Sequence, residues 1–163
     1  MMKFCPNCAN PLDRQTRDSH LRLVCTASDC DFIHWNNPTP VVAAVIEYQE
    51  QVLLVHHVGW PPKMLGLVSG FLEAREHPDD AMRREILEET SLRTHRLELL
   101  GHYPFPEQNQ IIIAYAAGCT GEVSLNDELD RYKLIDPKRV IPWPMGTGPA
   151  VKDWLEARLN NMP

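Results

Sequence analysis

Four of the five cysteines lie within the first 30 residues, in two short pairs. Two residues separate Cys5 from Cys8, four separate Cys25 from Cys30, and 16 lie between the pairs. The surrounding sequence is polar and lacks helical periodicity, so it cannot bury a core of its own and needs a cross-link. Two turns that each present two sulfurs supply the four thiolates that structural Zn²⁺ prefers. We therefore expect residues 1–37 to form a small zinc ribbon.

Two alternatives to this ribbon stay open. His20 or His34 could replace one cysteine as a ligand, or the thiols could be free. A disulfide framework is disfavoured because the N-terminus has neither the apolar segment of a secretory signal nor the character of a transit peptide. For the same reason we expect a cytoplasmic protein, and we expect Cys119, far from the others, to be a core residue.

A second domain is predicted over residues 38–163. The sequence changes character after the Asn-Asn-Pro-Thr-Pro breaker at 36–40, and apolar, β-branched runs follow. No apolar run approaches the roughly 18 residues that cross a bilayer, so we expect no membrane role. The predicted strands cover 41–48, 51–57, a short segment ending at 69–70, and then 97–102, 111–117 and 132–135, with a terminal helix over 149–160.

The strongest helix signal lies over residues 78–90. Pro78 suits a first helical position, and Asp79 and Asp80 complement the positive end of the helix dipole. Strands, one helix, more strands and a final helix predict an α+β fold in which a mixed sheet is sandwiched between helices.

This helix carries clustered carboxylates. Glu85, Glu88 and Glu89 fall at i, i+3 and i+4, which places three like charges on one face. Such crowding favours a bound cation, and hard carboxylate oxygens suit Mg²⁺ or Mn²⁺. On the helix alone, an ordinary acidic surface with Arg84 paired to Glu88 explains the pattern equally well.

The wider sequence resembles the signature box of the Nudix hydrolases. Gly70, Glu76 and the run Arg84-Glu-Ile-Leu-Glu-Glu-Thr-Ser-Leu92 match it over 23 consecutive residues, with every charged position in agreement. Two positions depart from the box: Ser91 replaces its second glycine, and Arg75 replaces a glycine common before its first glutamate. A serine in a left-handed helix cap would cost about 1 kcal/mol relative to glycine.

The resemblance implies a Nudix-type α/β/α sandwich and a set of site residues. Glu85, Glu88 and Glu89 would hold divalent cations together with the Gly70 carbonyl, and Arg84 would orient the carboxylates. Glu76 would support the loop and helix from beside the site. A general base from outside the box is expected at Glu128, with Glu122 as second candidate; both also fit an acidic surface loop.

The order of ribbon and box resembles NADH, FAD and ADP-ribose pyrophosphatases, which implies hydrolysis of a small-molecule nucleoside-diphosphate compound. Trp60, Tyr103 and Phe105 flank the box and could stack on a base or flavin, or simply pack. The net charge of −6 argues weakly against an RNA-cap substrate. The competing interpretation is a non-catalytic nucleotide-sensing or RNA- or protein-binding module, and the related proteins make a homodimer possible.

Overall fold

The computed structural model describes residues 2–160, and this part of the chain forms two compact units, the first ending at Pro38 and the second beginning at Thr39. The first is a three-stranded antiparallel sheet in the order β1-β2-β3, with β1 (Leu12–Arg17), β2 (His20–Cys25) and β3 (Ile33–His34). A two-residue turn joins β1 to β2, and both of its residues have positive φ, as the twist of a tight hairpin requires. Among the described residues of this unit, the buried hydrophobic ones are Cys5, Val24 and Cys25, so it has almost no hydrophobic core.

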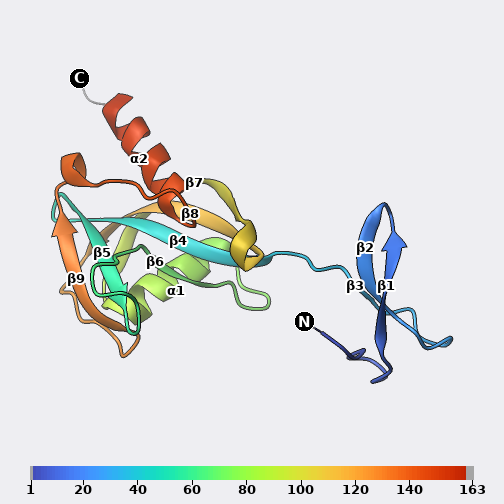
Figure 1. The fold of residues 1–163 in the computed structure, drawn as a ribbon. Helices are drawn as coiled ribbons and strands as arrows, with labels where there is room; N and C mark the ends of the chain where they lie inside the picture. Colours follow the sequence, from blue (N-terminus) through green and yellow to red (C-terminus); the bar gives the residue numbers. More distant parts are fainter. Residues whose placement is uncertain (1, 161–163) are drawn as a thin grey trace. The chain divides into compact units, whose positions relative to one another are not determined.

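The second unit is built on one mixed sheet (Figure 1). Its main strand order is β7-β8-β4-β5-β9; β4 and β8 are parallel, and the other neighbours are antiparallel. Strand β6 pairs with the first half of β4, on the edge that β5 occupies further along. The strands are β4 (Thr39–Tyr48), β5 (Gln51–His57), β6 (Val68–Phe71), β7 (Arg93–Phe105), β8 (Gln110–Thr120) and β9 (Leu129–Ile135).

Two helices cover the two faces of this sheet (Figure 1). Alternate residues of β4 enter different clusters: Val42, Ala44 and Ile46 pack toward α1 (Pro78–Thr90), whereas Val41, Ala43 and Val45 pack toward α2 (Gly148–Asn160). The central strand is therefore apolar on both sides, as strands buried between helices are. The predicted α+β sandwich with a mixed sheet is confirmed.

Strand β7 runs from Arg93 to Phe105, well beyond the predicted 97–102. It is an edge strand, and its pairing with β8 is irregular near positions 95 and 100. Exposed polar residues are interspersed with half-buried ones along it, so a search for apolar runs finds only part of its length. Short 3-10 turns, η1 (Pro106–Gln108) and η2 (Pro137–Arg139), follow β7 and β9. No helix within residues 2–160 is long and apolar enough to span a bilayer.

Candidate functional site

The four N-terminal cysteines converge in the first unit. Their sulfurs all lie within 4.8 Å of one another, with 3.7 Å between Cys5 and Cys30 and 3.4 Å between Cys8 and Cys25. Tetrahedral ligation with metal–sulfur bonds of about 2.3 Å places sulfurs about 3.8 Å apart, so the spacing fits a single Zn²⁺. The Asn10 amide donates to the Cys8 sulfur over 3.5 Å and lowers the pKa of that thiol to about 6, which favours the thiolate.

The second site begins with the two ends of α1. Pro78 occupies the first turn, and His77 caps the helix by accepting the backbone N–H of Asp79. At the other end Ser91 adopts the left-handed conformation, with φ 60°, as its place in the sequence predicted. Its hydroxyl donates to the carbonyl of Ser124 at 3.1 Å, a bond that glycine could not make. This bond offsets part of the strain that the missing glycine leaves.

Arg84 ties the carboxylates of the helix to the preceding loop. Its guanidinium donates to both oxygens of Glu76, at 2.8 and 3.0 Å, and to Glu85 at 2.7 Å and Glu88 at 3.1 Å. A fifth contact reaches the carbonyl of Phe71 at 3.2 Å. The bidentate pairing lowers the pKa of Glu76 and raises that of Arg84, so both groups stay charged. Arg84 thus links Glu76 to the carboxylates of the helix, and the supporting roles expected of both residues stay predictions.

Gly70 gives the Glu85 carboxylate its position. A Cβ atom at residue 70 would lie 1.9 Å from Cδ of Glu85 and 2.0 Å from one carboxylate oxygen. The carboxylate therefore rests directly against the backbone of β6 at Gly70, the residue whose carbonyl the resemblance assigns as a metal ligand. Any side chain at this position would occupy the space of the carboxylate.

Glu89 is the carboxylate that most needs a partner. It is 2% exposed, and its Oε2 atom has no hydrogen-bond donor among residues 2–160. Burial, together with the negative charges of Glu85, Glu128 and Glu88, raises the pKa of Glu89 to about 8. A buried, unpaired carboxylate among other carboxylates is unfavourable without a cation, so this donor set fits Mg²⁺ or Mn²⁺.

The carboxylates of α1 are less closely gathered than the cysteines. Among residues 2–160 the four sulfurs form the one group tight enough to hold a metal ion as it stands. Glu85 and Glu88 are turned toward Arg84 instead. Binding a cation would require Glu88, whose side chain is 56% exposed, to rotate from this ion pair, a small movement for an exposed side chain.

The connection between β8 and β9 brings Glu128 to the same region. The backbone N–H groups of Ser124 and Asn126 donate to the last carbonyls of α1, those of Thr90 and Glu89, at 2.9 and 3.2 Å. Glu128 follows two residues later, and its negative charge contributes to the raised pKa of Glu89. Glu122 and Glu128 are both exposed, but only Glu128 is among the charges that raise the pKa of Glu89, which favours Glu128 over Glu122 as the base.

Of the three aromatic residues expected at the substrate site, Tyr103 and Phe105 lie on the face of the sheet away from α1, whereas Trp60 lies beside His57. Tyr103 and Phe105 are half-buried in the cluster under α2, on the face of the sheet opposite α1. The Tyr103 hydroxyl donates to Asp153 of α2 at 2.7 Å. Trp60 packs between His57, at a ring distance of 4.5 Å, and Gly66. These contacts are packing contacts, and the substrate-binding role of the three residues stays a prediction.

Two histidines that no sequence pattern singles out lie near Glu128 in the structure. His56 is 3% exposed and hydrogen-bonds Asp130 at 2.7 Å. His57 has a buried Nε2 atom without a partner in the described chain, and burial lowers the pKa of its ring. Neither residue has metal-ligand spacing, so only tertiary structure reveals them.

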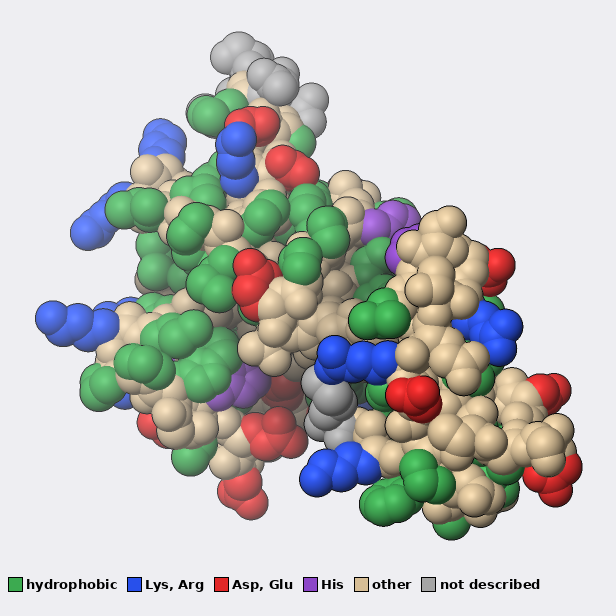
Figure 2. Space-filling view, turned by 45° about the vertical axis from the view of Figure 1, so that its right-hand side comes forward, with side chains coloured by type: hydrophobic (Ala, Val, Ile, Leu, Met, Phe, Trp, Pro, Cys, Tyr) green, Lys and Arg blue, Asp and Glu red, His purple; other side chains and the backbone are tan. Residues whose placement is uncertain are grey.

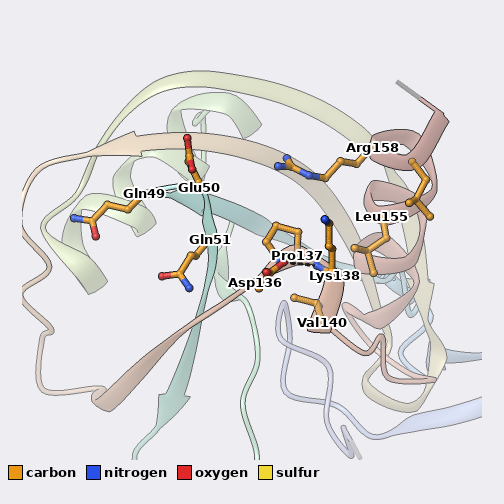
Figure 3. Close-up of a pocket in the computed structure, with 10 residues that line it drawn as sticks. Gln49, Glu50, Gln51, Asp136, Pro137, Lys138, Val140, Leu155 and Arg158 are labelled. Atoms are coloured by element: carbon orange, nitrogen blue, oxygen red, sulfur yellow. Dashed lines mark hydrogen bonds between the residues drawn. The ribbon is translucent and has the colours of Figure 1, made fainter. Parts of the chain in front are cut away.

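A separate hollow lies at the other end of the sheet. A cavity of about 690 Å³ is bounded by the β4–β5 turn, η2 and the end of α2 (Figure 3). Lys138 and Arg158 point toward the space beside the turn, with Glu50 across from them (Figure 3). Strand β5 runs from this end, at Gln51, to His57 near the carboxylates, a span of about 20 Å for seven residues.

The combination of sheet, carboxylate helix and four-cysteine ribbon defines a class. The NUDIX domain family model matches residues 37–155, and the Nudix N-terminal zinc-ribbon model matches residues 3–36. The chain belongs to the Nudix family.

Particular relatives are similar over most of the chain. The NAD-capped RNA hydrolase NudC of Vibrio vulnificus is 25% identical over 166 residues, covering 99% of this chain and 60% of the relative. Human NUDT12, also named an NAD-capped RNA hydrolase, is 26% identical over 145 residues, covering 83% of this chain and 30% of that protein. The chain thus spans less than two thirds of the length of these curated relatives. A crystal structure of a NUDIX hydrolase from Nitrosomonas europaea matches with a TM-score of 0.80 at 26% identity, over 99% of this chain and 95% of that one.

Proposed function

We propose that this chain hydrolyses the pyrophosphate bond of a nucleoside-diphosphate compound with the help of Mg²⁺ or Mn²⁺. The observation that carries the proposal is the carboxylate group of α1: Glu89 is buried with an unpaired oxygen, and Glu85 lies against Gly70. A protein that used this helix only for packing would gain nothing from burying an unpaired carboxylate beside two others.

The chain's own residues have distinct tasks in this reaction. Glu85, Glu88, Glu89 and the Gly70 carbonyl would hold the cations, which neutralise the diphosphate and acidify a water molecule. Arg84 keeps Glu85 in place through its 2.7 Å bond and is itself anchored by Glu76. Glu128 would accept the proton of the attacking water at its carboxylate.

A dinucleotide such as NADH, FAD or ADP-ribose is the substrate that we favour. The presence of a four-cysteine ribbon in the same chain as the Nudix domain supports it, as do relatives whose names specify NAD. Those names also favour a second candidate substrate, an RNA that carries an NAD cap, in which the same pyrophosphate bond would be cleaved. The acidic net charge argues weakly against this RNA substrate. On the face seen in Figure 2, Lys and Arg side chains project singly rather than in a dense basic patch. We therefore place the free dinucleotide first.

The test is a substrate panel with a matched pair of variants. Purified protein with Mg²⁺ is given NADH, FAD, ADP-ribose, nucleoside triphosphates and a short NAD-capped RNA, and nucleoside monophosphate release is measured. Glu88→Gln should lose at least about 100-fold in kcat. Glu156→Gln is the control, because Glu156 is also a helical glutamate in an i, i+4 ion pair, and its side chain is 60% exposed.

The outcomes separate enzyme from sensor. Monophosphate release that depends on Glu88 and not on Glu156 supports hydrolysis, and the preferred compound identifies the substrate. Tight binding of a nucleotide with no product from any compound would support the non-catalytic module instead.

A further inference from the structure

Strand β9 contains a bulge next to Glu128. His56 of β5 pairs with Arg131 and His57 pairs with Leu129, so Asp130 is an extra residue on β9 with no opposite partner. A bulge turns the strand locally and changes the direction of neighbouring side chains, and bulges are common beside active sites. The direction in which Glu128 leaves the strand therefore depends on how this bulge is held.

A buried histidine holds the bulge. The Nδ1 atom of His56 bonds Oδ1 of Asp130 at 2.7 Å, and its Nε2 atom bonds the carbonyl of Pro61 at 3.2 Å. One ring thus connects β5, the extra residue of β9 and the loop that follows β5. Because the histidine is only 3% exposed, its ring has little freedom to release either partner.

A second contact closes the connection around Glu128 itself. The backbone N–H of Val58, two residues after His56, donates to the carbonyl of Glu128 at 2.8 Å. Two residues further along, Asp130 is held by His56. The residue expected to act as base is therefore held at its own carbonyl by a backbone bond, and the chain just after it is held at the bulge by a side-chain bond.

We propose that His56 is a positioning residue for the reaction: by holding Asp130 it fixes the bulge of β9 and thereby the direction of the Glu128 carboxylate. The proposal rests on the proposed function, in which Glu128 is the general base. Proton transfer requires a base within hydrogen-bond reach of the water, so a small rotation of Glu128 lowers kcat and leaves substrate binding almost unchanged.

A double-mutant cycle tests this coupling. His56→Gln keeps one donor for two acceptors and should lower kcat about 10-fold, with KM and Mn²⁺ affinity changed less than about 2-fold. Glu128→Gln should lower kcat by about 100-fold or more. If His56 acts through Glu128, adding His56→Gln to Glu128→Gln should cause almost no further loss.

Tyr115→Phe is the matched control for stability. It removes a bond of the same length, 2.7 Å, to another aspartate Oδ1, that of Asp79 in α1. It should lower the melting temperature about as much as His56→Gln without the loss in kcat. If His56→Gln fails to fold, Asp130→Ala replaces it in the cycle, since alanine removes the acceptor for His56 and should lower kcat by a similar factor of about 10.

Each result decides the question. Equal losses from His56→Gln with and without Glu128, full activity of His56→Gln, or a loss that appears only in KM would overturn the positioning role. Full activity of Glu128→Gln would instead remove the base assignment in the proposed function, and the positioning role with it. The cation site is judged separately, because a loss of product in Glu88→Gln supports it whichever way the cycle turns out.

Discussion

Replacing Gly70 by alanine tests the close contact between Gly70 and Glu85, because the change adds one carbon atom where the carboxylate lies. Gly70→Ala places a Cβ atom 1.9 Å from Cδ of Glu85, whereas carbon atoms in contact normally lie about 3.5–4.0 Å apart. The carboxylate must therefore retreat by about 1.5–2 Å. Gly70 does not have a positive φ, so alanine itself introduces no backbone strain. The damage should be confined to the carboxylate.

The displacement is large on the scale of catalysis. A misplacement of about 1 Å can reduce a rate about 100-fold, so we expect Gly70→Ala to lose at least about 100-fold in kcat/KM, or about 2.7 kcal/mol of transition-state stabilisation. The free energy of unfolding should fall by only about 1–2 kcal/mol, because Glu85 can turn toward solvent and lose little beyond its pairing with Arg84. Calorimetric titration with Mn²⁺ and initial rates measure the first effect, and urea unfolding measures the second.

Two further variants show whether the cause is steric. Gly101→Ala adds the same carbon on β7, where the nearest atom is the Tyr103 hydroxyl at 3.2 Å, and should retain activity. Glu85→Asp shortens the displaced side chain, so its loss and that of Gly70→Ala should not add in the double variant. Mn²⁺ affinity and turnover of Gly70→Ala within about 3-fold of the parent would refute the reasoning.

Three other predictions concern the helix and the ribbon. Without divalent cations, the free energy of unfolding should fall as the pH rises from about 4.3, the ordinary carboxyl pKa, to about 8. The reason is that the folded state keeps a proton on Glu89 that the unfolded state releases. In urea unfolding, Glu89→Gln should show a weaker dependence on pH. Ser91→Gly should change the free energy of unfolding by less than about 0.5 kcal/mol, since relief of strain offsets the lost hydroxyl bond, whereas Ser91→Ala should destabilise by about 1 kcal/mol in the same assay. Metal analysis should find one Zn²⁺ per chain, and Cys8→Ser should reduce this several-fold and lower the melting temperature of the ribbon.

The helix and its C-terminal cap were predictable because their signals are local, whereas the cap by His77 was not predicted. Pro78 and the following aspartates begin the helix, and Ser91 ends it in the left-handed conformation that its place in the box implied. The convergence of the four cysteines also follows from spacing, since two short turns bring each pair together. In these places nearby residues decide the structure.

Contacts between residues far apart in the chain could not be predicted from sequence patterns. Tyr103 lies in β7, and its hydroxyl donates to Asp153 of α2, 50 residues away. No local sequence pattern indicates that bond. His56 and Asp130 are 74 residues apart and meet only because β5 pairs with β9. An isolated histidine in an apolar run looks the same whether it fills a core or holds a bulge.

The bonds between the end of α1 and the β8–β9 connection also limit how this protein can change. Ser124 and Asn126 are bound to consecutive carbonyls of the helix, so the number of residues from there to Glu128 is fixed. An exposed side chain in this connection can be exchanged without breaking these backbone bonds, but one inserted or deleted residue between 124 and 128 would move the carboxylate by a full residue along the chain. Change in this connection should therefore come through substitution, and variation in length should be confined to loops that hold no such bonds.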